Sequence, residues 1–419
     1  MATSGSQVYY PRLVDGLIAQ RLASAGAVVL EGAKGLGKTT TAQQFTNSAL
    51  HFGADTQAAQ LFNLDPAAVL AGERPRLLSE WQVVPASWNQ VRHAVDDADN
   101  PGQFMLTSSA QPPTDPTRHP GTGRFSRLPM GPLTLLESGM AQAAVSLAGL
   151  SAGEQARAAA LECTVTDVIQ RMVHGGFPNT HGQNLAAATR FNRGYLDQMA
   201  RFDVPGSCLP NYDPTRISAL IRALAQRVAT AGNVAALAQA THTGGAKLAR
   251  STVTAYLHAL KHIFFLNQQP AWAPALRSRA RLRKSPKLHL VDVALAIAAL
   301  RTNVQGLLTD LNTLGLLFES FVFQHLLVYS APIGGTVYHY CDSNDLEADA
   351  IIELRDGSWM AFEVKLGAGH IDQAAHSLLR LAAEVKKEPP AALVVLIPTG
   401  YAYTRNDGVQ VVPLTLLGP

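Results

Sequence analysis

The 419-residue sequence has few cysteines and no long apolar segment. Cys163, Cys208 and Cys341 are far apart and none lies in a C-x-x-C pair, so the sequence indicates neither a disulfide framework nor a zinc site. No run approaches the ~18 apolar residues that a membrane-spanning helix needs, and the N-terminal residues lack the apolar core of a secretory signal. These absences favour a cytoplasmic protein that is neither secreted nor embedded in a membrane.

Charge is also scarce. Only 16% of the residues are charged, and 34 Lys and Arg against 31 Asp and Glu give a formal net charge of +3. So small a charge predicts no class of partner, and evidence for nucleic-acid binding has to come from local runs of charge. The hydrophobic content of 47% is that of an ordinary globular protein, and the length suits two or three domains.

Residues 28–40, VVLEGAKGLGKTT, combine an apolar run, a glycine-rich turn and the start of an amphipathic pattern. This order predicts a strand, a loop and a helix, and the spacing fits the P-loop pattern G-x-x-x-x-G-K-[ST]. Backbone N–H groups of such a loop bind nucleotide phosphates, and its lysine reaches the β and γ phosphates. We therefore predict that ATP and Mg²⁺ bind here, with Thr39 as a ligand of the metal. The predicted nucleotide-binding residues are Gly32, Gly35, Gly37, Lys38, Thr39 and Thr40.

Three further strands are predicted after the P-loop. In a P-loop ATPase, the second of these three strands, here residues 74–82, should end in two acidic residues. One completes the Mg²⁺ sphere and the other polarises the attacking water. Glu80 is present, but Ser79 stands where the metal-side aspartate is expected. Asp65, at the end of an earlier predicted strand, is the alternative source of that charge. The predicted strands span residues 61–65, 74–82 and 103–109.

Hydroxyl side chains end the last of these predicted strands. Thr107, Ser108 and Ser109 could reach the γ-phosphate, because open α/β sheets bind ligands at the carboxyl ends of their strands; a polar strand end without a function is the alternative. The loop that follows presents Arg124, which is either an arginine finger for a neighbouring subunit of a homo-oligomer or an ordinary loop charge. The predicted catalytic residues are Lys38, Glu80 and Arg124.

The middle of the chain is helical in pattern. Residues from about 133 to 232 are alanine-rich with helical spacing and are interrupted at residues 174–178, HGGFP. We interpret residues 141–215 as a helical lid or connector. Residues 216–291 predict two helices, a strand and a basic run, the outline of a winged helix whose wing contacts DNA phosphates. A solvated hairpin is the alternative explanation of charges that alternate with apolar residues. The predicted DNA-contacting residues are Arg277, Arg279, Arg281, Arg283, Lys284 and Lys287.

The C-terminal portion holds a second group of chemically interesting residues. The spacing 363 − 349 = 14 suits a hairpin that carries Asp349 and Glu363 and turns at residues 355–358. Glu363 and Lys365, two apart on a strand, point to the same face. With Glu319 from a preceding helix, they could bind a divalent metal, as in the D…E-x-K constellation of restriction-endonuclease-like folds. A surface hairpin with an ion pair between Glu363 and Lys365 is the alternative.

The order of these motifs resembles that of a known family. The P-loop, the EWQ and LTSSAQP strands, the GTGR loop, the GGFP break, the RSR and RLR run and the DGSWMAFEVK hairpin are similar to those of bacterial and archaeal AAA-type P-loop ATPases whose C-terminal half is a domain of unknown function. The resemblance covers nearly the whole chain. It implies a Walker A motif of Gly32, Gly37, Lys38 and Thr39, a Walker B glutamate at Glu80, and nuclease-like residues at Glu319, Asp349, Glu363 and Lys365.

Two departures from that family have consequences for function. Its members usually have Asp-Glu-Trp-Gln where this chain has Ser79-Glu80-Trp81-Gln82. They usually have Thr-Gly-Ser-Ala where this chain has Thr107-Ser108-Ser109-Ala110. The first departure implies inefficient Mg²⁺-dependent hydrolysis with nucleotide binding retained.

We therefore expect an α/β protein with an AAA-like P-loop ATPase core, a helical lid, a winged-helix-like middle and a restriction-endonuclease-like α/β domain. The leading hypothesis for its function is an ATP-binding, slowly hydrolysing ATPase that acts on or near DNA. One alternative is a metal-dependent DNA nuclease coupled to an ATPase, and another is a nucleotide-gated regulatory or interaction protein with little catalytic activity. The expected domains, in the same order, are residues 1–140, 141–215, 216–291 and 292–419.

Overall fold

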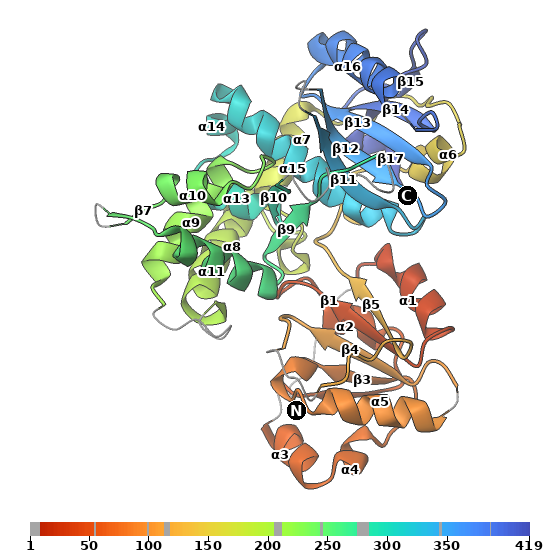
Figure 1. Cartoon of the computed structure of the whole chain (residues 1–419), viewed down its shortest axis with the longest axis vertical. Helices are drawn as coiled ribbons and strands as arrows, with labels where there is room; N and C mark the ends of the chain where they lie inside the picture. The colour runs from red at the N-terminus through yellow and green to blue at the C-terminus, as the bar shows by residue number, and fades with distance from the viewer. Residues whose placement is uncertain are drawn as a thin grey trace. The chain divides into compact units, whose positions relative to one another are not determined.

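The computed structural model (Figure 1) describes residues 9–53, 56–98, 100–112, 118–204, 212–243, 246–274, 285–342, 346–385 and 387–419. The chain divides into two compact units. Unit 1 comprises Met1–Gly131, Phe177–Asn179 and His262–Phe264. Unit 2 comprises Pro132–Gly176, Thr180–Lys261 and Phe265–Pro419.

Unit 1 is built on a parallel five-stranded sheet with the strand order β2-β3-β4-β1-β5. The first four residues of β1 are fully buried, as expected for a central parallel strand covered on both faces. The strands are β1 (Ala27–Glu31), β2 (Ser48–His51), β3 (Arg76–Ser79), β4 (Phe104–Ser108) and β5 (Phe125–Pro129). The helices are α1 (Val14–Leu22), α2 (Lys38–Gln43), α3 (Thr56–Leu64), α4 (Pro66–Leu70) and α5 (Ser87–Ala98).

The prediction of a strand at residues 61–65 is wrong. Most of this segment forms the end of α3, and the Asp65 carboxylate accepts a hydrogen bond from the Ala68 N–H at 3.0 Å, which caps α4. Pro66 favours this arrangement because it is preorganised for the first position of a helix. The strand beside β3 is formed instead by β2, nearer to the P-loop.

Unit 2 begins with helices that surround α13. The first six residues of α13 are buried, and α7, α8 and α9 all pack against it. The predicted break at residues 174–178 is confirmed: α7 ends at Gly175, whose φ of 84° is a conformation that favours glycine. The helices are α6 (Leu147–Ser151), α7 (Val165–His174), α8 (Leu185–Gln198), α9 (Pro214–Gln226), α10 (Val234–Ala240), α11 (Arg250–His262), α13 (Val293–Leu300), α14 (Val304–Thr309), α15 (Leu311–Ser330) and α16 (Ile371–Glu384).

An antiparallel pair of strands, β9 (Leu266–Gln269) and β10 (Lys287–Leu290), follows α11. The backbone continues from β9 alongside the C-terminal sheet, where the Trp272 N–H donates to the His339 carbonyl at 2.7 Å. Helices α9 and α11 and strand β9 lie in the segments where the sequence predicts two helices and a strand, whereas α10 is an additional helix between them. The winged-helix comparison stays a prediction. A short pair, β7 (His242–Thr243) and β8 (Ala246–Lys247), precedes α11.

The C-terminal half of unit 2 is a mixed six-stranded sheet with the order β11-β12-β13-β14-β16-β15, on which α15 and α16 pack (Figure 1). The predicted hairpin is confirmed: β12 and β13 are antiparallel, with Ala350 opposite Phe362. Gly357, with φ of 86°, provides the left-handed residue of the turn. The strands are β11 (Thr336–Cys341), β12 (Glu347–Glu353), β13 (Trp359–Val364), β14 (Ala392–Ile397), β15 (Tyr403–Thr404) and β16 (Gln410–Pro413), beside a separate parallel pair, β6 (Val145–Ser146) and β17 (Leu417–Gly418).

Helix α15 is long and apolar enough to cross a membrane by length and composition alone, with a mean hydropathy of 1.3. More than half of the apolar stretch, 56%, is buried inside the protein, as in the core helix of a soluble protein. Among the described residues it is the one helix that meets these criteria, which makes it weak evidence for a membrane span.

Candidate nucleotide site and carboxylate cluster

The predicted P-loop connects β1 to α2 in unit 1. Gly37 caps α2 in a left-handed conformation with φ of 89°. Gly32 lies against the strand end at Met130, whose carbonyl oxygen would be 2.4 Å from a Cβ at position 32. The two glycines are therefore required by the local backbone, and the loop leads directly into the N-terminus of a helix, where anions are favoured.

Lys38 is buried, with only 4% of its surface exposed. Its ammonium donates a hydrogen bond to the Ala33 carbonyl within the loop at 2.8 Å. Burial lowers the pKa of Lys38 to about 8, and the nearby Glu80 carboxylate opposes part of that effect. A lysine cation held in so poorly solvated a place is a strong partner for phosphate oxygens.

Three hydroxyl groups meet beside the P-loop. The Ser79 Oγ lies 2.9 Å from the Thr39 Oγ1, and the Thr107 Oγ1 donates to Ser79 at 3.3 Å. Ser79 is buried at the end of β3, between β2 and β4. The residue at the metal-side position is thus next to the predicted metal ligand, but it contributes a neutral hydroxyl where a carboxylate would contribute charge.

Glu80 follows Ser79 in a left-handed conformation, with φ of 56°. Its backbone N–H donates to the Thr107 Oγ1 at 3.2 Å. Its carboxylate accepts hydrogen bonds from the Ser109 hydroxyl at 2.5 Å and from the Gln82 amide. The unusual backbone and these two bonds fix the carboxylate, whose charge opposes the lowering of the Lys38 pKa by burial.

Ser108, Asp65 and Arg124, the other residues predicted to act near the nucleotide, all have partners within the protein. The Ser108 hydroxyl donates to the Ala110 carbonyl, so it is occupied within its own turn. Asp65 caps α4, as described above, and is occupied there. Arg124 forms an ion pair with Asp96 at 2.7 Å, while 42% of its side chain stays exposed, and its role as an arginine finger remains a prediction.

Sequence reasoning missed several residues that line a pocket beside the P-loop. Arg12 is buried and donates to the Leu36 carbonyl at 3.0 Å and the Gly131 carbonyl at 2.8 Å, which ties the N-terminal segment to the loop. Pro178, from the GGFP break, lies 3.5 Å from where a Cβ of Gly37 would be. The pocket has a volume of about 440 Å³ and is lined by Tyr9, Tyr10, Arg12, Gly37, Thr40, Thr41, Pro178 and Asn179.

The predicted nuclease-like residues gather in unit 2 with two lysines. The Lys287 ammonium lies 2.5 Å from the Glu319 Oε1 and 3.8 Å from the Asp349 Oδ1. The Lys365 ammonium lies 2.7 Å from the Glu363 Oε2 and 3.9 Å from the Asp349 Oδ2. Asp349 therefore lies between the two pairs, and we call these five residues the carboxylate cluster.

The carboxylate cluster brings three carboxyl groups together with two lysines in a largely buried place. Burial raises the pKa of Glu319 to about 8, and Asp349 adds to the effect. Burial also raises the pKa of Glu363 to about 7, again with a contribution from Asp349. Burial alone would lower the pKa of Lys287, but Glu319 and Asp349 raise it by more. Groups perturbed in this way by burial and a charged neighbour are candidates for a functional site.

The carboxylate cluster does not form a ready metal cage. In the part of the chain that the structure describes, no group of three or more His, Cys, Asp or Glu side chains is arranged to hold a metal ion. Each carboxylate already meets an ammonium, and the Asp349 Oδ2 also accepts from the Val364 N–H at 2.7 Å. The structure thus brings Glu319, Asp349 and Glu363 close together but does not arrange them as metal ligands. Metal binding by these residues stays a prediction.

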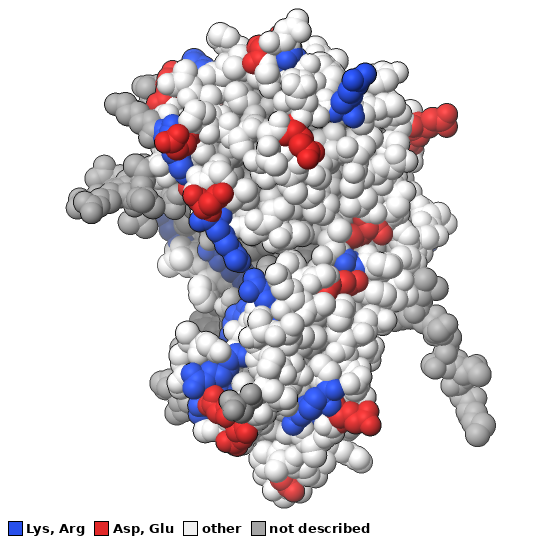
Figure 2. Space-filling model, turned by 90° about the vertical axis from the view of Figure 1, so that its right-hand side faces the viewer, with Lys and Arg blue, Asp and Glu red and all other residues white. Residues whose placement is uncertain are grey.

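The predicted DNA-contacting run is only partly described. Arg277, Arg279, Arg281, Arg283 and Lys284 lie outside the described residues. Lys287 is described: its side chain is 14% exposed and is paired with Glu319 in the carboxylate cluster, apart from any solvated run of charge. Most of the face that Figure 2 shows is uncharged, in keeping with the low charged fraction of the sequence, but Lys and Arg side chains gather along its left side. DNA contact therefore stays a prediction that depends on the undescribed part of the run.

Comparison with known protein families finds matches to three parts of the chain. An AAA domain family matches residues 24–138, and two domains of unknown function, DUF8612 and DUF4143, match residues 165–306 and 314–417. A solved Walker-type ATPase of Pyrococcus abyssi is similar over 71% of this chain and 98% of its own, with 10% identity and a TM-score of 0.42, a level that does not define a fold. No curated protein matches the chain. Residues 24–138 thus match an AAA domain, and their parallel sheet is consistent with a P-loop ATPase core.

Proposed function

We propose that this chain is an ATP-binding protein that hydrolyses ATP slowly and acts on or near DNA. The observation that carries the first part is the contact between the Ser79 and Thr39 hydroxyls at 2.9 Å. It puts a neutral group in the position from which an ATPase of this class normally supplies negative charge to the Mg²⁺ sphere. The metal should therefore be held more weakly, and turnover should suffer more than nucleotide binding.

The residues beside the P-loop fit this chemistry. The loop N–H groups and the N-terminus of α2 would hold the phosphates, and the Lys38 ammonium would exchange the Ala33 carbonyl for phosphate oxygens. Thr39 would hold Mg²⁺, which supplies neutralisation of the β and γ oxygens when it is bound. Glu80, fixed by Ser109 and Gln82, would orient and deprotonate the attacking water. The pocket between Tyr10 and Pro178 is large enough to receive the nucleoside.

Restoring the missing charge tests the proposal. We expect Ser79→Asp to raise the turnover rate at low Mg²⁺ and to lower the Mg²⁺ concentration that gives half-maximal turnover, because a carboxylate would strengthen the metal sphere. Phosphate release measured across a Mg²⁺ titration gives both values. Ser79→Ala is the matched control, since it removes the hydroxyl without adding charge and should not improve the response to Mg²⁺. Superimposable titrations of the wild type and Ser79→Asp would show that the metal site is complete without an acid here.

A metal-dependent nuclease is the second candidate function, and the carboxylate cluster favours it. Asp349 and Glu363 lie on the two strands of one hairpin, and Glu319 comes from the helix before it. Burial, and to a smaller extent the Asp349 charge, raises the pKa of both glutamates. An added divalent cation would compete with Lys365 for Asp349 and Glu363. A restriction-endonuclease-like role places the phosphodiester chemistry at this cluster.

Cleavage of supercoiled plasmid DNA with Mg²⁺ or Mn²⁺ checks this second candidate. We expect the wild type to nick the plasmid and Asp349→Asn to lose the activity, because it removes the charge shared by both ion pairs. Glu353→Gln is the matched control: Glu353 lies on the same strand but pairs with Lys387 outside the cluster. A wild type that leaves the plasmid intact, or Asp349→Asn that cuts as well as the control, would exclude nuclease activity at the cluster.

A further inference from the structure

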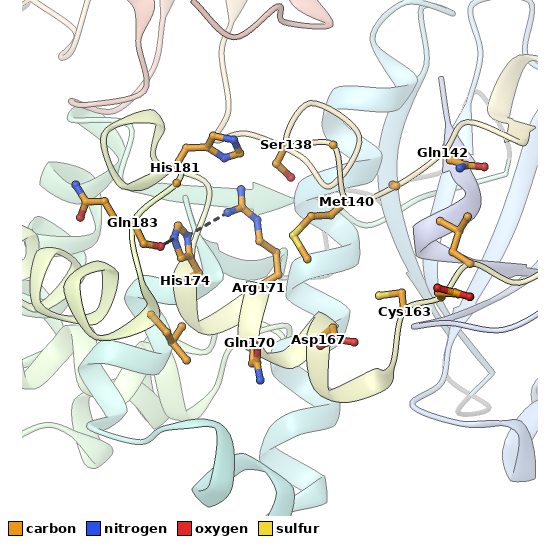
Figure 3. A pocket seen from close by; sticks show the side chains of 16 residues that line it. Ser138, Met140, Gln142, Cys163, Asp167, Gln170, Arg171, His174, His181 and Gln183 are labelled. Carbon is orange, nitrogen blue, oxygen red and sulfur yellow. Dashed lines mark hydrogen bonds between the residues drawn. The ribbon is translucent and has the colours of Figure 1, made fainter. Parts of the chain in front are cut away.

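A second cavity lies within unit 2, away from the carboxylate cluster (Figure 3). Its volume of about 700 Å³ lies within the range of small-molecule binding sites. It is walled by α7, by the turn at residues 138–142 and by the segment at residues 181–185. None of the functions discussed above uses this cavity.

Arg171 forms the cationic part of the cavity wall. It comes from the last turn of α7 and is only 6% exposed, so nearly all of its surface is buried. Its Nη1 lies 3.0 Å from the His174 Nδ1, whereas its Nη2 has no hydrogen-bond partner among the described residues. Figure 3 shows the guanidinium directed into the space between His174, His181 and Ser138. Burying a guanidinium N–H group without a hydrogen-bond acceptor costs free energy, unless a bound molecule accepts from it.

Asp292, whose charge acts on Arg171, does not satisfy that donor. Asp292 is buried and close enough to raise the pKa of Arg171 against the larger lowering effect of burial. Its Oδ2 accepts from the Gly176 N–H at 2.7 Å, and its Oδ1 accepts from the Ala294 N–H at 2.9 Å. Asp292 therefore offsets the charge of Arg171 from a distance while its own oxygens cap α13.

The histidine beside Arg171 is held between backbone carbonyl groups. The His174 Nε2 lies 3.2 Å from the Gln183 carbonyl oxygen, and its Nδ1 lies 3.1 Å from the Gly175 carbonyl oxygen. The same Nδ1 is the contact of the Arg171 Nη1, at 3.0 Å. This bond fixes one edge of the guanidinium and leaves the Nη2 edge oriented toward His181. Both histidines and the arginine thus meet at one end of the cavity.

The rest of the cavity has a different character. Met140, Leu161 and Leu185 provide apolar surface, and Cys163 contributes a free thiol. Asp167 also lines the cavity, but its carboxylate is occupied by the capping box with Thr164. A ligand that suits this lining has an anionic group at one end and an apolar body.

We propose that this cavity binds a small organic anion whose carboxylate or phosphate group is held by Arg171, with the apolar body against Met140, Leu161 and Leu185. An oxyanion accepts from the unmet Nη2 donor and replaces the missing partner with a charge-assisted hydrogen bond. Because the cavity lies within unit 2, this site is separate from the phosphate-binding loop of unit 1.

The thiol of Cys163 gives a local readout of occupancy that the P-loop does not affect. The full chain is alkylated with iodoacetamide, and the modification of Cys163 and Cys341 is followed by mass spectrometry. Inorganic phosphate, acetate and hexanoate are added in turn, with sodium chloride at the same ionic strength as the reference. We expect at least one oxyanion to slow the alkylation of Cys163 saturably and to leave Cys341 unchanged. Stronger protection by phosphate than by acetate would identify a phosphate group, and stronger protection by hexanoate would identify a carboxylate with an apolar tail.

Removal of the guanidinium tests its role. We expect Arg171→Met to lower the affinity of the cavity for the protecting anion by about tenfold or more, the usual loss when a charge-assisted hydrogen bond is removed. Arg193→Met, an exposed arginine on α8, is the matched control and should behave as the wild type. A folded Arg171→Met that retains protection would overturn the proposal. If that variant does not fold, the wild type still decides: no protection by any of the three anions, or equal protection of Cys163 and Cys341, would overturn it.

Discussion

Lys38→Ala should reduce ATP affinity by about tenfold to a hundredfold, because a buried charge-assisted contact contributes about 1.5–3 kcal/mol to binding. The expectation rests on the position of Lys38, which is 4% exposed and whose ammonium donates to a neutral backbone carbonyl in its own loop. Phosphate oxygens are better partners than that carbonyl, so the charge should contribute to nucleotide binding more than to stability. Isothermal titration with ATP gives the affinity.

The control for this prediction is Lys34→Ala, because Lys34 belongs to the same loop but is exposed. It should keep ATP affinity within about threefold of the wild type, as expected for a solvated charge near the site. Circular dichroism of each variant shows whether the fold is retained. Unchanged ATP affinity in a folded Lys38→Ala would exclude this lysine as a phosphate ligand.

Glu80→Gln should abolish most turnover and leave ATP bound. A carboxylate that orients and deprotonates the attacking water typically contributes about a hundredfold or more to the rate. An amide can still accept from the Ser109 hydroxyl, so the left-handed backbone at this residue should be preserved. Phosphate release and ATP titration on the same preparation separate the two effects.

A matched control for this variant is Glu73→Gln, a change of the same chemistry at an exposed residue of unit 1. It should match the wild type in both turnover and ATP affinity. Turnover in Glu80→Gln at the wild-type rate would mean that another group activates the water. Loss of ATP binding instead of turnover would mean that Glu80 supports the loop and does not act in catalysis.

The P-loop and the C-terminal hairpin could be predicted because both depend on local rules. The glycines of the loop and of the turn at Gly357 adopt backbone conformations that favour glycine, and the strands beside them are rich in apolar residues. The prediction of a strand at residues 61–65 was wrong because local rules are ambiguous there. A short apolar run does not distinguish a strand from a helix, and the deciding contact is the Asp65 cap of α4.

Other parts of the sites depend on residues far apart in the sequence. Arg12 supports the P-loop through the carbonyls of Leu36 and Gly131, and nothing near Arg12 indicates those partners. Lys287 was assigned to a basic run because of its neighbours in the sequence, but its ion-pair partner, Glu319, lies 32 residues further along the chain. Such long-range pairs are set by tertiary packing, which one sequence does not reveal. The contact between Ser79 and Thr39, by contrast, follows from two motifs that the sequence shows separately.

The fate of a single bound nucleotide tests the central claim most directly. The wild type and Ser79→Asp are loaded with radiolabelled ATP and Mg²⁺, freed of unbound nucleotide by rapid gel filtration, and sampled over time for bound ATP and ADP. If the neutral hydroxyl at Ser79 limits hydrolysis, the wild-type complex will still hold mostly ATP after Ser79→Asp has converted most of its nucleotide to ADP. A wild-type complex that holds only ADP at the first time point, or that retains no nucleotide, would contradict the account.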